Sequence, residues 1–138
     1  MRLRKNAKLD LLQGVPLFAR CSKKELAEIA QIADEIDLPE GKQLTKEGGR
    51  GREFFVLVEG NAEVKRKRRK IGTLGPGDFL GEIALVTRTP RTATVTTSSP
   101  VRALVVSEQN FRRLLDHNPQ VQIKVLEALA ERVAATSL

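Results

Sequence analysis

Sulfur and imidazole are scarce in this sequence, where Cys21 is the single cysteine and His117 the single histidine. A lone cysteine cannot form an intramolecular disulfide. One cysteine with one histidine also supplies too few soft ligands for a zinc site built by the protein. We therefore expect neither a disulfide framework nor metal chemistry, and neither residue is taken as part of a site.

Long apolar stretches are also missing. No run approaches the roughly 18–20 apolar residues that a membrane-spanning helix needs, and residues 1–14 lack the apolar centre of a signal peptide. The sequence therefore predicts a cytoplasmic protein without a membrane span. A length of 138 residues suits one domain with one core, and 41% hydrophobic with 30% charged residues is ordinary for a globular protein.

Positive charge, in contrast, is plentiful and concentrated. The chain has 24 basic and 17 acidic residues, a net charge of +7, and six basic residues are consecutive at 65–70. Such a run can contact nucleic-acid phosphates or an anionic membrane surface. Because no aromatic residue stands nearby to stack a base, we interpret the run as the exposed tip of a hairpin. Docking on nucleic acid or a membrane stays open as the alternative.

Helix signals occur at the N-terminal end. Ser22 and Glu25 have the spacing of a capping box, in which each side chain accepts a hydrogen bond from the other residue's backbone N–H. Apolar residues then recur on one helix face through about Ala33. An earlier helical piece is expected at about residues 7–13.

Helix signals return at the C-terminal end. Ser107 is a candidate N-cap for a helix that carries Phe111, and Asn118 followed by Pro119 predicts the start of a last helix. The apolar face of this last helix is expected to consist of Leu126, Leu129, Ala130 and Val133.

Between these helices the pattern changes to short β-rich runs separated by turn residues. The clearest predicted strands lie at residues 54–58, 62–64, 92–97 and 101–106. Many short strands with closely spaced turns indicate a sandwich or a barrel-like roll. We therefore predict a single domain of the α+β class, mainly β. A jelly-roll-like antiparallel β-roll (34–106) is flanked by N-terminal helices (1–33) and two C-terminal helices (107–138).

One segment of the roll departs from strand alternation. Residues 77–95 read GDFLGEIALVTRTPRTATV, and we call this segment the cassette. Gly81 removes a side chain where backbone N–H groups would approach an anion, and residues 82–85 can form one helical turn. Arg91, after the rigid Pro90, can hold two phosphate oxygens with its planar fork. Glu82 would repel a phosphate, so its role must be to accept a hydrogen bond from a sugar hydroxyl. Phosphate and sugar together indicate a nucleotide.

The cassette resembles the phosphate-binding cassette of the cyclic nucleotide-binding domains, the family of the catabolite activators and of the protein kinase A regulatory subunits. Its start matches the family pattern Phe-X-Gly-Glu-X-Ala-Leu, and its end matches Pro-Arg-X-Ala. The matching residues are Phe79, Gly81, Glu82, Ala84, Leu85, Pro90, Arg91 and Ala93.

The resemblance implies a ligand site. Arg91 would hold the exocyclic phosphate oxygens, Glu82 the ribose 2′-hydroxyl, and backbone N–H groups near Gly81, Ile83 and Ala84 the phosphate. Thr92, with Ala93 beside it, stands where a hydroxyl can reach the phosphate or a guanine 2-amino group. The candidate base pocket is Val64, Ile71, Leu74 and Leu80. One departure is the loop at residues 48–52, GGRGR, which replaces a more acidic turn often seen in the family.

The function that follows is a regulatory sensor that binds cAMP or cGMP without acting on it. We expect cAMP first, because Thr92 permits both nucleotides and nothing excludes adenine. Occupancy would be relayed by the C-terminal helices, and the last of these can close over the base in this family. An enzyme of the cupin type is not expected, because one histidine cannot supply its metal cluster. The alternatives left open are the ligand-binding part of a trimmed DNA-binding regulator and a module of a channel, kinase or other effector chain.

Overall fold

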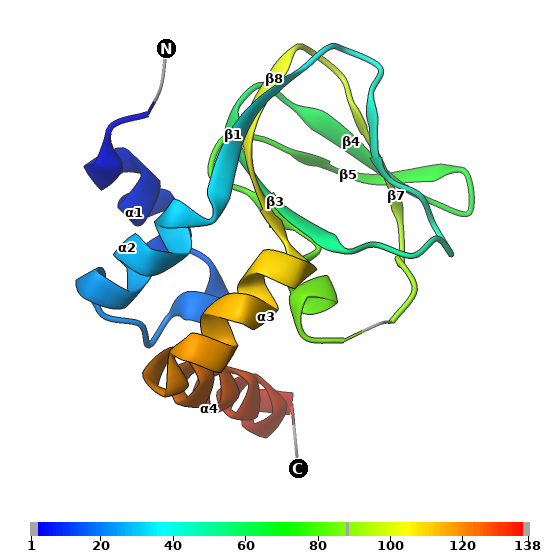
Figure 1. Ribbon diagram of the computed structural model, residues 1–138. Helices are drawn as coiled ribbons and strands as arrows, with labels where there is room; N and C mark the ends of the chain where they lie inside the picture. Colours follow the sequence, from blue (N-terminus) through cyan, green and yellow to red (C-terminus); the bar gives the residue numbers. More distant parts are fainter. Residues whose placement is uncertain (1–2, 88, 137–138) are drawn as a thin grey trace. The chain divides into compact units, whose positions relative to one another are not determined.

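The computed structural model of the chain describes residues 3–87 and 89–136. It contains two compact units (Figure 1). The helical unit is built from the two ends of the chain, up to Ile32 and from Gln109 onward, and the β unit is built from residues 33–108.

The N-terminal part of the helical unit contains α1 (Lys5–Gln13), the short 3-10 helix η1 (Pro16–Phe18) and α2 (Lys23–Gln31). The capping box is present: the Ser22 hydroxyl oxygen accepts the Glu25 N–H at 3.2 Å, and the Glu25 carboxylate accepts the Ser22 N–H at 2.7 Å. The prediction placed the end of this helix at Ala33, which is too late. Ala33 already pairs with Val106 in a sheet, so its backbone is extended.

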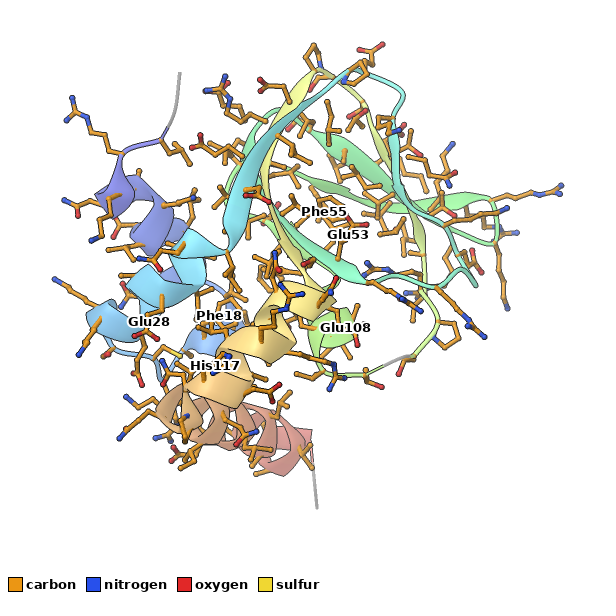
Figure 2. The ribbon with its side chains drawn as sticks, viewed as in Figure 1. Phe18, Glu28, Glu53, Phe55, Glu108 and His117 are labelled. Atoms are coloured by element: carbon orange, nitrogen blue, oxygen red, sulfur yellow. The ribbon has the colours of Figure 1, made fainter. Side chains whose placement is uncertain are left out.

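The C-terminal part contains α3 (Glu108–His117) and α4 (Pro119–Thr136), joined at Asn118. Asn118 acts as the predicted N-cap, because its side-chain oxygen accepts the Val121 N–H at 3.4 Å. Helix α4 packs on η1, and the Phe18 and Phe111 rings lie 5.7 Å apart in the same core. Figure 2 labels Phe18 and, at the end of α3, His117.

The predicted apolar face of α4 is wrong. Leu126 is 61% and Val133 is 63% exposed, whereas Val121, Val125 and Ala128 are buried. Both sets have helical spacing, because apolar residues occupy two sides of this helix. The sequence pattern alone therefore could not decide which side packs against the rest of the unit.

Ion pairs and hydrogen bonds tie α4 to the N-terminal helices. The Lys124 ammonium lies 2.5 Å from the Glu25 carboxylate, Arg20 pairs with Glu131, and the Asn118 amide donates to Glu28. Burial tends to raise the pKa of Glu25, but the hydrogen bonds from Lys124 and Ser22 outweigh it and hold the pKa below its ordinary value. The charged pair is thus a specific contact between α2 and α4.

Cys21 is buried in this helical unit. Burial, helped by the nearby Glu25 charge and partly offset by Lys124, raises the pKa of its thiol to about 11. The thiol is therefore protonated at neutral pH, which removes the nucleophilic form of cysteine. Among the described residues no group of three histidine, cysteine, aspartate or glutamate side chains could hold a metal ion. None of the described helices is long and apolar enough to cross a membrane.

The β unit consists of two four-stranded antiparallel sheets, in the orders β1-β8-β3-β6 and β2-β7-β4-β5 (Figure 1). Its buried centre contains Leu57, Ala62, Val95, Val101 and Ala103. The predicted α+β fold with an antiparallel β-roll between terminal helices is confirmed. The strands are β1 (Ala33–Leu38), β2 (Gln43–Thr45), β3 (Glu53–Glu59), β4 (Ala62–Arg66), β5 (Arg69–Leu74), β6 (Phe79–Leu80), β7 (Thr94–Thr97) and β8 (Val101–Ser107).

Strand β7 begins two residues later than the predicted run at 92–97. The carbonyl oxygens of the two residues before it are taken by side chains instead of a neighbouring strand. The Arg66 Nε–H donates to the Thr92 carbonyl at 3.0 Å, and the Thr45 hydroxyl donates to the Ala93 carbonyl at 3.0 Å. Side-chain bonds of this kind end the ladder locally.

The basic run forms the β4–β5 hairpin tip, as predicted, and all six of its side chains are exposed. Its two loop residues, Lys67 and Arg68, have positive φ values of 51° and 66°. Positive φ at both positions is the geometry of a two-residue hairpin turn, although it usually selects asparagine or glycine.

Candidate functional site

The β unit contains a cavity of about 400 Å³, within the size range of small-molecule sites. Most of its lining comes from the cassette. The lining residues are Thr45, Val64, Arg66 and Leu74 from the strands, with Phe79, Leu80, Gly81, Glu82, Ile83, Ala84, Thr89, Pro90, Arg91, Thr92, Ala93 and Val95 from the cassette.

The Arg91 side chain is held by β3, the strand that pairs with β6 of the cassette. Its Nη2 group donates to the carbonyl oxygen of Glu53, the first residue of β3. Figure 2 labels Glu53 on this strand. Its Nη1 group lies against Gly81, where an added Cβ would be only 2.1 Å from that nitrogen. The glycine predicted for close backbone approach therefore makes room for the arginine.

The loop at residues 48–52 is the second support of Arg91. The Arg91 N–H donates to the Gly49 carbonyl, and the Gly48 N–H donates to the Arg91 carbonyl, both at 2.8 Å. An added Cβ at Gly51 would lie 1.6 Å from Arg91 Nε. The loop that departs from the family pattern thus contacts Arg91 with its backbone atoms, and Gly51 leaves the space that the guanidinium occupies.

The partly buried Arg91 guanidinium has a hydrogen-bond donor that no described residue uses. Among the described residues its buried Nε makes no hydrogen bond, and no carboxylate forms an ion pair with the guanidinium. Burial lowers the pKa of Arg91, and the Glu53 charge opposes this only in part. A buried cation of this kind gains stability from an anion that supplies acceptors.

Glu82 lies next to Gly81 in the same wall of the cavity. Gly81 has a φ of 81°, the left-handed conformation that favours glycine. The predicted helical turn follows as the 3-10 helix η2 (Glu82–Leu85), and Glu82 is only 5% exposed. The Ala84 N–H already donates to the Gly81 carbonyl at 3.0 Å, so an anion would have to share that N–H.

Three of the four predicted base-pocket residues line the cavity. Val64, Leu74 and Leu80 line the cavity, but Ile71 does not and is 51% exposed. In the β4–β5 ladder Val64 pairs with Gly72 and Lys65 pairs with Lys70, so Ile71 is the extra residue of a β-bulge and falls outside the regular alternation. We therefore remove Ile71 from the candidate site.

Thr92 and Ala93 line the cavity as well, and the remaining lining residues show what sequence reasoning missed. Thr45 and Arg66 come from strands far from the cassette in sequence, and no motif marked them. Arg66 was interpreted together with the basic run at residues 65–70, because its residue type does not distinguish it from the other five. Of the six, Arg66 alone is among the residues that line the cavity.

Comparison with known proteins identifies the family of the chain. The family model described as "Cyclic nucleotide-binding domain" matches residues 35–118. A curated relative, the cAMP-dependent protein kinase regulatory subunit of Mycosarcoma maydis, is 41% identical over 116 residues, covering 75% of this chain and 22% of the relative. The chain therefore spans about a fifth of the length of that protein.

Solved structures share the fold over most of the chain. The N-terminal domain of a transcriptional regulator from Streptomyces coelicolor A3(2) has a TM-score of 0.85 at 30% identity, covering 93% of this chain and 95% of that one. A cyclic nucleotide-binding-like protein from Brucella abortus has a TM-score of 0.75 at 27% identity, covering 80% and 98%. A cAMP-bound PfPKA-R has a TM-score of 0.68 at 27% identity, covering 92% and 46%. This chain therefore belongs to the cyclic nucleotide-binding domain family.

Proposed function

We propose that the chain is a regulatory module that binds a cyclic purine nucleotide, cAMP or cGMP, in the cassette cavity without acting on it chemically. The observation that carries the proposal is the buried Arg91 guanidinium, which has an unpartnered Nε beside a cavity whose wall includes the buried Glu82. A cyclic phosphate carries one negative charge, and its ribose keeps a free 2′-hydroxyl. The pair of side chains matches those two groups.

In this proposal Arg91 binds the exocyclic phosphate oxygens, with backbone N–H groups of Gly81, Ile83 and Ala84 as additional donors. The Glu82 carboxylate accepts the ribose 2′-hydroxyl. Val64, Leu74 and Leu80 contact the base, and Thr92 with Ala93 closes the end of the cassette. The similarity to a cAMP-dependent kinase regulatory subunit and to a cAMP-bound structure supports cAMP as a ligand.

The proposal predicts a specific dependence of binding on Glu82. Calorimetric titration of the wild type should show binding of cAMP and cGMP, and about tenfold weaker binding of 2′-deoxy-cAMP, because a hydrogen bond to a charged group is lost. The Glu82→Ala variant should bind cAMP about tenfold more weakly than the wild type. It should no longer distinguish cAMP from the deoxy ligand.

Linear 5′-AMP and an exposed carboxylate serve as controls. Linear AMP should bind poorly, and Glu40→Ala, at an exposed position outside the cavity, should leave every affinity unchanged. The proposal fails if the wild type binds neither cyclic nucleotide. The role of Glu82 fails if Glu82→Ala still distinguishes cAMP from its deoxy form as strongly as the wild type does.

We also propose that occupancy is relayed through the C-terminal helices, because a ligand shifts an equilibrium toward the conformation it binds better. The Lys124–Glu25 ion pair connects α4 to α2. Asn118, the N-cap of α4, adds a hydrogen bond to Glu28 of the same helix α2. Independent closure of α4 over the base would have to break these contacts. We therefore expect the helices of this unit to respond together.

Hydrogen exchange with and without cAMP tests the relay. The amides of α2 and α4 should change protection together when cAMP is added, since their shared contacts couple them. A change confined to α4 would contradict joint movement, and no change in any helix would contradict the relay itself.

Through this relay the module would act on another part of a longer chain, such as a DNA-binding, channel or kinase segment, or on a separate partner. The cytoplasmic location expected from the sequence stays a prediction.

A further inference from the structure

Arg66 stands apart from the other five residues of the basic run. It is the last residue of β4, and its side chain lines the cavity, whereas the other five do not. Its Nε–H donates to the Thr92 carbonyl at 3.0 Å. Within the described residues its two terminal nitrogens make no hydrogen bond. The guanidinium is thus held at one nitrogen and has free donors at the others.

The other polar side chains of the cavity have partners in the structure or roles in the proposed function. Under the proposed function, on which this inference rests, Arg91 and Glu82 bind the phosphate and the ribose. The Thr45 hydroxyl donates to the Ala93 carbonyl, and the Thr89 hydroxyl is within 3.0 Å of the Thr87 hydroxyl. The side chains that remain to contact polar base atoms are Arg66 and Thr92.

The chemistry of the guanidinium discriminates between purines. Arginine carries five N–H donors and no acceptor. Guanine presents two acceptors on one edge, O6 and N7, which suit a pair of donors, whereas adenine presents the N6 amino donor beside N7. A fixed guanidinium therefore gains more from a 6-oxopurine than from a 6-aminopurine.

We propose that Arg66 is a specificity-determining residue of this site and that it raises the affinity for 6-oxopurine cyclic nucleotides, such as cGMP, relative to cAMP. The expectation of cAMP from the cassette alone is thereby modified: Thr92 permits both bases, and Arg66 favours guanine. The competing interpretation is that Arg66 only supports the Thr92 backbone and adds positive charge. That interpretation predicts the same effect on every nucleotide.

The test is calorimetric titration of the whole chain with cAMP, cGMP and cyclic inosine monophosphate. The inosine ligand has O6 and N7 but lacks the 2-amino group, so it separates contacts of Arg66 from any contact of Thr92 with that amino group. Arg66→Ala should lower the affinities for cGMP and the inosine ligand about tenfold and change that for cAMP less than about twofold. Arg66→Gln should shift the preference toward cAMP, because an amide pairs with adenine N6 and N7.

The matched control is Arg69→Ala, which removes the same charge from the neighbouring hairpin position. Arg69 pairs with Arg66 in the ladder, is exposed and does not line the cavity. It should leave the cAMP to cGMP ratio unchanged. An equal loss for all three ligands in Arg66→Ala overturns the inference, as does a loss for cGMP that spares the inosine ligand. These failures differ from failure of the proposed function, in which the wild type binds none of the ligands.

Discussion

Replacing Arg91 by alanine is expected to lower the affinity for cAMP and for cGMP by about 100-fold or more. The guanidinium can form two charge-assisted hydrogen bonds with one phosphate, each worth about 1.5–3 kcal/mol. These bonds form where water is largely displaced, since the Arg91 Nε is buried. Calorimetric titration at constant ionic strength measures the loss, and thermal denaturation shows that the variant is folded.

Two companion variants make the Arg91 result specific. Arg91→Lys keeps the charge but loses the planar fork, so its affinity should lie between those of the wild type and Arg91→Ala. Arg113→Ala removes an exposed arginine of α3 outside the cavity and should change nothing. If Arg91→Ala is folded and binds cAMP within about threefold of the wild type, Arg91 is not the phosphate ligand.

The grouping of the cassette residues was predictable because these residues are neighbours in the sequence. Gly81, Glu82 and Arg91 lie within one short segment, and the type of each residue indicates its chemistry. The structure places all three in the lining of one cavity and forms the predicted helical turn after Gly81. Local sequence was therefore sufficient to predict that these residues lie together, and their contacts with a ligand stay predictions.

The supports of Arg91 were not predictable, because they come from a distant part of the chain. Glu53 lies 38 residues before Arg91 and contributes a carbonyl, which every residue type possesses. Gly49 likewise contributes only backbone, and Gly51 contributes the absence of a side chain. None of these contributions has a residue signature that a single sequence displays.

Strand register explains the error at Ile71. Alternation identifies the inward face of a strand only while the ladder is regular. The β4–β5 ladder shifts register between Val64 and Lys65, which makes Ile71 the extra residue on β5. A bulge of this kind depends on pairing across the hairpin, so the sequence of one strand does not reveal it. Arg66 is two residues after Val64 on β4, and both line the cavity, as regular alternation along β4 predicts.

Gly51→Ala is expected to lower cyclic nucleotide affinity about 30-fold while changing the melting temperature little. The new Cβ would lie 1.6 Å from Arg91 Nε and 2.1 Å from Cζ, so one of the two groups must move. The guanidinium is the end of a long side chain and can move at small cost to the fold. Its displacement removes it from the place where the phosphate would bind. Gly81→Ala is less informative, because the φ of 81° and the Glu53 carbonyl at 2.8 Å would also strain the backbone.

A double-mutant cycle separates displacement of Arg91 from general damage to the loop. In the Arg91→Ala background the Cβ at residue 51 has no guanidinium to displace, so Gly51→Ala should cause no further loss of affinity. Gly14→Ala is the matched control, since its Cβ would meet only the Leu11 carbonyl at an ordinary 3.5 Å. Additive losses from the two substitutions would show that Gly51 acts on binding without Arg91. Strong coupling would show that the glycine loop contributes to the site by holding the arginine in place.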